Sequence, residues 1–332
     1  MVLSDTTVLA NRKPVEAPVV LVLYNRPAHV RQVFAAIAAA RPRRLFLVAD
    51  GPKDHADAEK CQAARAEVGR IDWPCEVHRN YAEANLGIHR RLPTGLDWVF
   101  ESADRAIILE DDCIPSLSFF PFCEQLLERF QNDERVMEIA GGNYQMGRRR
   151  TAYSYYFSRY WGVWGWATWR RAWRHFDGEM RDWPRLRDAG FLDSVLPRAV
   201  ERDYWIRCFD ALVRGEVTTW DWQWLFTLWA QHGLSVVPEV NLISNIGYGE
   251  EATNLRAPTG PDANLPRHEM GELEHPPWVF PNTAADRFLF DVVLPGSKLR
   301  LLPSALRGAI WWSWRTLRQG ARWVQRRRGR LV

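Results

Sequence analysis

The chain has 332 residues, 47% of them hydrophobic, and a formal net charge of +4. This composition excludes a disordered or fibrous protein and allows one large α/β domain with additions or two smaller domains. The five cysteines are odd in number and scattered, which predicts reduced thiols in a cytosolic protein rather than disulfides or a zinc site. We expect neither a secretion signal nor a membrane span, because the longest early apolar run suits a single strand.

The first half of the chain is predicted to alternate strands with helices. Continuous apolar runs closed by turn residues indicate strands over residues 19–24, 44–49, 75–78 and 106–109. Apolar residues at helical spacing indicate helices over residues 28–40, 56–71 and 92–100. This alternation predicts an α/β fold with a mostly parallel, Rossmann-like sheet flanked by helices, whose ligands bind at the C-terminal ends of its strands.

Beyond residue 115 the pattern changes character. An amphipathic segment (117–130) and a strand (136–140) precede an aromatic-rich stretch (153–173), and two helices (199–213, 223–232) and a strand (234–240) follow. Residues 256–296 are rich in Pro, Asn and Gly and are expected to wrap the surface. We therefore divide the chain into an N-terminal extension (1–18), one domain (19–255) with a nucleotide-binding half (19–145) and an acceptor half (146–255), a surface segment (256–296) and a tail (297–332).

The tail differs from the rest of the chain in charge. No acidic residue follows Asp291, whereas ten basic residues do, so residues 1–291 carry a net charge of −6. From residue 301 onward, apolar residues at three- and four-residue steps form one helical face and arginines form another. This pattern predicts a basic amphipathic helix that lies on an anionic membrane surface, at the inner face of the plasma membrane. Docking of the apolar stripe on the protein body is an alternative, and nucleic acid is not expected because no nucleic-acid motif accompanies the arginines.

Three adjacent carboxylates, Glu110, Asp111 and Asp112, follow the predicted strand at 106–109. Along an extended chain Glu110 and Asp112 point one way and Asp111 the other, so the three can serve a metal, a ribose and a sugar at once. A divalent cation needs only one or two protein carboxylates when it also binds water and phosphate oxygens. Acidic residues after a strand are also common in turns and helix caps, and the motif alone leaves that interpretation open.

Tryptophan occurs 18 times, with dense clusters over residues 161–173 and 220–229. Most of these indoles are expected to pack in the core. An indole face also binds the apolar C–H face of a pyranose, so some of them are candidates for sugar contacts.

The order of several sequence runs resembles nucleotide-diphospho-sugar transferases of the GT-A fold. The run ILEDDCIPSLSFF, preceded by strands that end in YNRP and VADG, is similar to the metal motif of the inverting N-acetylglucosaminyltransferase I type. Bacterial family 2-like glycosyltransferases share further runs, namely GLDWVF, WGWATWRRAW, TWDWQW and SNIGYGEEAT. The resemblance covers about residues 19–255, and it implies a metal-dependent inverting glycosyltransferase of polysaccharide biosynthesis. Such an enzyme moves a sugar from a nucleotide-diphospho-sugar, for example UDP-GlcNAc, to a glycan or lipid-linked glycan.

The resemblance also implies roles for individual residues. It implies that Asp112 binds Mn²⁺ or Mg²⁺ and that Asp221 is the general base that deprotonates the acceptor hydroxyl. The remaining implied contacts are to the nucleotide-sugar donor: Asp50 to the base, Asp111 to the ribose, Arg26 to the diphosphate or uridine, and Glu110 and Trp220 to the sugar. Arg90 and Arg91 are expected to supplement the metal at the diphosphate.

The chain departs from the family pattern at the base, because Trp222 stands where the related enzymes have a second acidic residue. Asp221 is alternatively the N-cap of the helix that follows it. Rival bases are Glu201, Asp203, Glu250 and Glu251. Two other functions compete: a sugar-nucleotide nucleotidyltransferase, although YNRPAHV lacks the glycines of a phosphate loop, and a non-catalytic membrane-surface protein with a transferase-like body.

Overall fold

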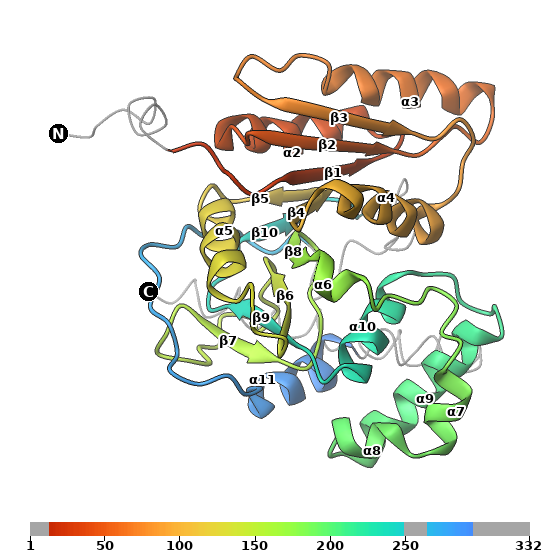
Figure 1. Cartoon of the computed structure of the whole chain (residues 1–332), viewed down its shortest axis with the longest axis vertical. Coiled ribbons are helices and arrows are strands. Elements are labelled where there is room, and N and C mark those ends of the chain that lie inside the picture. Colours follow the sequence, from red (N-terminus) through yellow and green to blue (C-terminus); the bar gives the residue numbers. More distant parts are fainter. Residues whose placement is uncertain (1–12, 249–263, 295–332) are drawn as a thin grey trace, which may run out of the picture.

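The computed structural model describes residues 13–248 and 264–294. These residues form an α/β fold around an eight-stranded, mostly parallel sheet flanked by helices (Figure 1). The strands, in spatial order, are β3 (Glu76–Tyr81), β2 (Arg44–Ala49), β1 (Val19–Leu23), β4 (Arg105–Glu110), β8 (Trp166–Trp169), β6 (Val136–Ala140), β9 (Leu234–Pro238) and β7 (Tyr155–Ser158). The first four are parallel, whereas β8 runs antiparallel to β4 and β6, and β7 antiparallel to β9.

Helices cover both faces of the sheet. The helices are α2 (Pro27–Ala40), α3 (His55–Glu67), α4 (Ile88–Ser102), α5 (Phe119–Arg129), α6 (Arg170–Trp173), α7 (Trp183–Asp188), α8 (Phe191–Val195), α9 (Ala199–Val213), α10 (Asp221–Ala230), α11 (Thr283–Phe288) and the π-helical turn η1 (Leu289–Val293). A short antiparallel pair, β5 (Cys113–Pro115) and β10 (Ile243–Asn245), forms a second sheet. In Figure 1, α7, α8 and α9 gather with α10 to one side of the central sheet.

Alternation along the strands divides the core into two layers. In β1, Val19, Leu21 and Leu23 pack with α2, α3 and α5, whereas Val20 and Val22 pack with α4, α6 and α10. Both sets are buried because successive side chains of a strand point to opposite faces of the sheet. A third cluster is rich in aromatic residues and joins α7, α8, α9 and α10. Most indoles are therefore packing residues, as expected.

The predicted elements of the first half are confirmed, with small shifts at their ends. The predicted bounds 44–49, 136–140 and 199–213 coincide with β2, β6 and α9. The aromatic-rich stretch, for which the sequence predicted no element, supplies the two strands β7 and β8. All five cysteines are free and four are buried.

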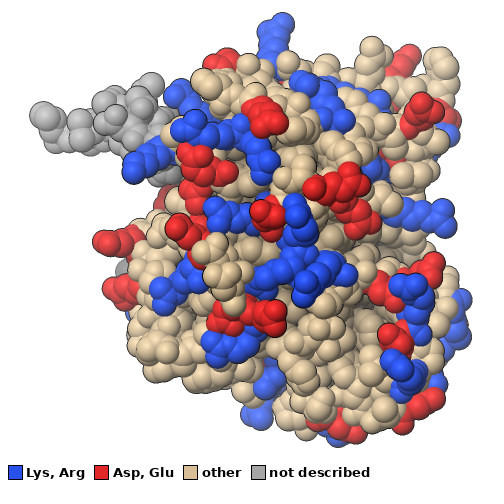
Figure 2. Space-filling view, viewed as in Figure 1, with Lys and Arg blue, Asp and Glu red and all other residues tan. Residues whose placement is uncertain are grey.

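The segment expected to wrap the surface, residues 256–296, contains regular structure in its described part. Its described part, residues 264–294, ends in α11 and η1, where Ala285, Asp286 and Phe290 are buried against the body. The predicted tail, residues 297–332, lies outside the described residues. Within the described ranges, no helix combines the length and apolarity that crossing a bilayer requires. On the face shown in Figure 2, basic and acidic side chains are interspersed.

Glu138 is a carboxyl group inside the sheet. One of its oxygens accepts hydrogen bonds from the Gly162 backbone N–H (2.7 Å) and the Ser235 hydroxyl (2.8 Å), and the other accepts from Trp224 Nε1 (2.5 Å). Because Glu138 is fully buried, its pKa rises to about 7 even though these bonds oppose the rise. Glu138 thus ties β6 to β9, to α10 and to the loop before β8.

Replacing Glu138 with Gln is expected to flatten the pH dependence of the free energy of unfolding. The raised pKa means that Glu138 stabilises the fold fully below its ordinary pKa of 4.5 and that this contribution is lost as the pH rises through about 7. As the pH rises across this range, the free energy of unfolding of the wild type should fall by about 3 kcal/mol more than that of Glu138→Gln. Urea unfolding at a series of pH values measures both curves, and parallel curves would contradict the expectation.

Candidate active site

A cavity of about 500 Å³ opens at the C-terminal ends of β1, β2 and β4. Eight of the nine predicted site residues line it: Arg26, Asp50, Arg91, Glu110, Asp111, Asp112, Trp220 and Asp221. Arg90 is the exception, because it lies exposed on the first turn of α4 and is not part of the lining. The predicted site is therefore one place in the fold, although its members are up to 195 positions apart in the sequence.

The sheet brings these residues together through strand register. Leu23 at the end of β1 lies beside Ala49 at the end of β2, and Val22 lies beside Glu110 at the end of β4. The residues that follow these three ends consequently meet at one edge, as ligand-binding residues do in parallel sheets.

Arg26 is held between two of the three carboxylates. Its guanidinium bonds to Asp111 and lies 3.1 Å from Asp112 Oδ2. Burial raises the pKa of Asp111 to about 6, although Arg26 opposes the rise. Burial and then the charges of Asp112 and Asp111 raise the pKa of Glu110. With Asp50, Lys53 and Arg91 included, four carboxyl groups and three basic groups line this end of the cavity, and a bound cation would offset the repulsion between Asp111 and Asp112.

Asp112 fits a metal that takes most of its ligands from elsewhere. Among the described residues, no group of three or more His, Cys, Asp or Glu side chains is placed to hold a metal ion. Mg²⁺ and Mn²⁺ at diphosphate sites nevertheless bind through one or two carboxylates and keep waters and phosphate oxygens. Gly247, in the loop after β10, leaves Asp112 room, since a Cβ at position 247 would lie 2.1 Å from Asp112 Oδ2.

Gly247→Ala is expected to weaken metal-dependent binding of a nucleoside diphosphate by about 100-fold, because the added methyl group displaces the Asp112 carboxylate. Gly271→Ala is the matched control, since a Cβ there meets nothing within 4 Å. Calorimetry with UDP and Mn²⁺ measures the binding, and thermal unfolding checks that both variants fold. Equal binding by the two variants would show that binding does not depend on the space that Gly247 leaves beside the Asp112 carboxylate.

Asp50 lines the cavity, but its carboxylate is occupied by the protein. It accepts hydrogen bonds from the backbone N–H groups of Gly51 (2.9 Å), Leu86 (2.9 Å) and Gly87 (3.0 Å) and from Asn85 Nδ2 (3.0 Å). Four donors fill the acceptor positions of a carboxylate. The geometry therefore makes Asp50 the anchor of the 85–87 loop, which also lines the cavity, rather than the contact to a base that the resemblance implies.

Arg91 is likewise committed to the fold. Its Nε donates to the Ala49 carbonyl (3.0 Å), and its guanidinium donates to the carbonyl and side-chain oxygens of Asn80 (2.6 and 2.7 Å). Burial lowers the pKa of Arg91. Arg91 thus connects the ends of β2 and β3 through its hydrogen bonds. Neither Arg91 nor the exposed Arg90 is placed to bind a diphosphate in the way that the resemblance implies.

Lys53 is a cavity residue that the sequence analysis did not select. It is exposed, lines the cavity beside the acidic end, and places its ammonium 5.6 Å from the centre of the Tyr24 ring. The available signal was its position three residues after Asp50, in the turn that closes β2. Together with Arg26 it places positive charge in the lining beside the three carboxylates.

Asp221 faces the cavity from the first residue of α10. Thr219 and the Trp161 side chain hydrogen-bond to its carboxylate, and burial raises the pKa of Asp221 above its ordinary value. The N-cap alternative is wrong, because Trp220 occupies the cap position and Asp221 is already helical. A carboxylate with a raised pKa in a cavity is suited to accept a proton.

The rival bases are less well placed. Glu201 is 3% exposed, pairs with Arg198 at 3.1 Å and is not part of the cavity lining. Asp203 is exposed on α9 and also lies outside the lining. Glu250 and Glu251 lie outside the described residues.

Aromatic side chains form much of the wall next to Asp221. Trp220 is stacked on Trp166, with ring centres 5.7 Å apart and planes 25° apart. It is 4% exposed, so most of the indole is packed and only its cavity edge is available. Other aromatic residues of the lining are Tyr24, Tyr144, Trp161, Trp164, Trp205 and Trp222.

The chain matches no family model, and no curated protein matches it as a relative.

Proposed function

We propose that the protein is a metal-dependent glycosyltransferase of the GT-A type that inverts the configuration of the transferred sugar. The observation that carries this proposal is the single cavity in which an acidic, cation-favouring end lies together with Asp221. The parallel strands β3, β2, β1 and β4, which deliver the acidic residues at their C-terminal ends, are compatible with this fold type.

The donor would occupy the end of the cavity that Arg26, Lys53 and the three carboxylates line. Asp112 would hold Mn²⁺ or Mg²⁺, which when bound neutralises the charge that develops on the departing diphosphate. Arg26 and Lys53 would bind phosphate oxygens, and Glu110 and Asp111 remain candidates for the donor's hydroxyl groups. Asp50 would act indirectly, by fixing the 85–87 loop.

Asp221 would serve as the base of the transfer. It takes the proton of an acceptor hydroxyl as that oxygen bonds to the anomeric carbon. The bond between the anomeric carbon and the diphosphate oxygen breaks at the same time, and its electron pair leaves with the diphosphate. Trp161 and Thr219 hold the carboxylate in place through their hydrogen bonds.

A panel of nucleotide sugars tests this function directly. The purified protein with Mn²⁺ should release nucleoside diphosphate from one donor, a UDP-sugar being expected, and transfer its sugar to a glycan acceptor. Binding of neither UDP nor GDP by calorimetry, together with no release from any donor, would favour the non-catalytic membrane-surface protein instead.

Deleting residues 297–332 is expected to abolish binding to anionic liposomes and to leave nucleoside diphosphate release unchanged. The reason is that ten basic residues and no acidic ones follow Asp291, whereas all the predicted site residues that line the cavity precede residue 222. Liposome co-sedimentation with anionic and neutral lipids measures the first effect. A deletion variant that still sediments with anionic liposomes would contradict the role of the tail.

A further inference from the structure

The cavity has two chemically different halves. Seven charged residues line the half formed by the strand ends and α4: Arg26, Asp50, Lys53, Arg91, Glu110, Asp111 and Asp112. Among the described lining residues from Tyr144 onward, Asp221 alone is charged. The same lining holds an apolar wall made of Trp205, Val217, Trp222, Leu289, Val293 and Leu294, and all of these but Val293 belong to or pack against one hydrophobic cluster. Asp221 thus lies where these two groups of lining residues meet, since its charge also acts on Glu110 of the charged group.

The aliphatic part of this wall comes from the π-helical turn η1. The Leu294 N–H donates to the Leu289 carbonyl at 3.1 Å, an i to i+5 bond that places these two residues one turn apart. Phe290 between them is buried, with its ring 5.5 Å from Tyr204. Leu289, Val293 and Leu294 remain partly accessible at the cavity, which leaves apolar surface available to a ligand.

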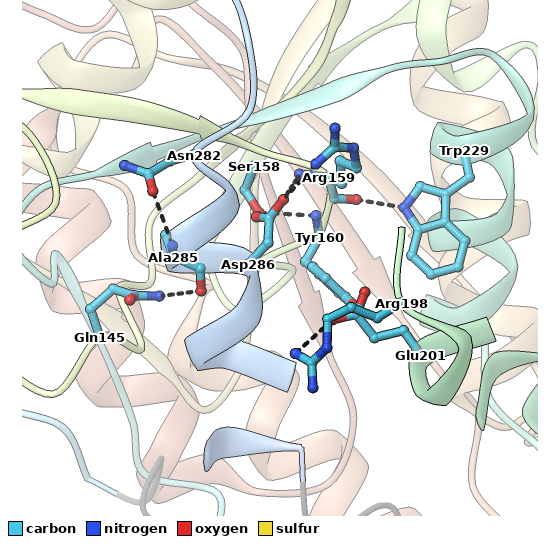
Figure 3. Close-up of polar contacts among 10 residues, drawn as sticks. All are labelled: Gln145, Ser158, Arg159, Tyr160, Arg198, Glu201, Trp229, Asn282, Ala285 and Asp286. Carbon is cyan, nitrogen blue, oxygen red and sulfur yellow. Dashed lines mark hydrogen bonds and ion pairs between the residues drawn. The ribbon is translucent and has the colours of Figure 1, made fainter. Parts of the chain in front are cut away.

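Polar contacts fix this segment to the body, as Figure 3 shows for its N-terminal part. Asp286 in α11 accepts a hydrogen bond from the Ser158 hydroxyl (2.6 Å) and contacts the Arg159 guanidinium (3.4 Å). Asn282 caps the helix by accepting from the Ala285 N–H at 3.0 Å. The apolar wall is therefore part of a preformed site.

A second set of contacts holds η1 itself. Arg198, the N-cap residue of α9, donates two hydrogen bonds to the Asp291 carboxylate, at 2.8 and 3.0 Å. This two-pronged pairing fixes the orientation of the turn, with Asp291 directed to α9 and Leu289 and Val293 to the cavity.

We propose that the apolar wall is an acceptor subsite for a hydrocarbon group, so that the acceptor is a lipid-linked or otherwise alkyl-bearing glycan. The inference rests on the proposed function for its chemistry, since Asp221 must meet the reacting hydroxyl. Aliphatic side chains offer hydroxyl groups no hydrogen bonds, so a second sugar would leave polar groups unsatisfied against Leu289, Val293 and Leu294. A hydrocarbon group buries the same surface favourably.

Octyl and methyl glycosides of the same sugars test the subsite by binding alone. Calorimetry below the micelle concentration should show octyl glycosides binding the wild type at least about tenfold more tightly than methyl glycosides. Val293→Asp should remove this preference, because it places a charge in the apolar wall. Val292→Asp is the matched control: it is the same substitution at the next residue, whose side chain is 40% exposed and outside the lining.

The outcomes separate this subsite from the proposed reaction. A preference for octyl glycosides that Val293→Asp abolishes and Val292→Asp keeps supports the subsite even when no donor is turned over. No preference in the wild type, or one that survives Val293→Asp, overturns the subsite, because the alkyl group then binds elsewhere, for example at the exposed Trp278 and Phe280. Nucleoside diphosphate release without any alkyl preference leaves the transferase standing and removes the subsite alone.

Discussion

Asp112→Asn should lower metal-dependent release of nucleoside diphosphate by about 1,000-fold or more. The neutral amide is a poor ligand for Mg²⁺ or Mn²⁺, and the lost cation no longer stabilises the charge that develops on the leaving diphosphate. Stabilisation of several kcal/mol corresponds to a rate factor of this size. Initial rates over a Mn²⁺ titration measure the effect, and the variant should remain inactive at metal concentrations that saturate the wild type.

Asp104→Asn is the matched control for this prediction. Asp104 precedes β4 as Asp112 follows it, but its side chain is 89% exposed and pairs with Arg170 at the surface. The control should keep the wild-type rate and metal dependence. Full activity of Asp112→Asn, or equal losses in the two variants, would remove Asp112 from the metal site and leave Glu110 or Asp111 as the candidate ligand.

Asp221→Asn is expected to lower sugar transfer by about 100- to 10,000-fold while leaving donor binding unchanged, because an amide cannot take the acceptor's proton. The pH profile adds a second readout. Burial raises the pKa of Asp221, so the carboxylate of the wild type becomes protonated and inactive at a higher pH than an ordinary aspartate would. The rate of transfer by the wild type should therefore rise with pH through this raised pKa. The residual rate of the variant should not show this rise.

Asp203→Asn serves both as the control and as the test of a rival base. It lies on α9 outside the cavity lining, so its rate and pH profile should match those of the wild type. Loss of transfer in Asp203→Asn with retention in Asp221→Asn would reverse the assignment. Equal loss of donor binding and transfer in Asp221→Asn would instead make it a donor-binding residue.

Asp50 and Arg91 show where reasoning from the sequence stops. Both line the cavity, Asp50 because it directly follows the end of β2 and Arg91 because it lies near the start of α4. Their roles could not be inferred from the sequence. Residues 85–87 donate hydrogen bonds to the Asp50 carboxylate, and Arg91 donates its hydrogen bonds to Asn80 and Ala49. Such pairings depend on neighbours in space that no local pattern specifies.

The α11–η1 segment shows a different limit. Its composition of Pro, Asn and Gly favoured a loose wrapping, whereas the folded chain buries Phe290 and turns Leu289 and Val293 toward the cavity. The sequence signal was weak because η1 is five residues long and its i to i+5 repeat matches neither helical nor strand spacing. Contacts with the body select this conformation, among them those of Gln145 with Ala285, Ser158 with Asp286 and Arg198 with Asp291.

The sequence by itself determined the alternating elements, the burial of β1, β2 and β4, and the position of the three carboxylates at a strand end. These follow from hydrophobic periodicity and turn residues, which act within a few positions of the chain. The tertiary structure alone decided that β8 enters antiparallel between β4 and β6, that Asp221 joins the carboxylates in one cavity, and that η1 forms its apolar wall. These features arise from packing and hydrogen bonds between distant segments, whose energies depend on distance in space rather than on separation in sequence.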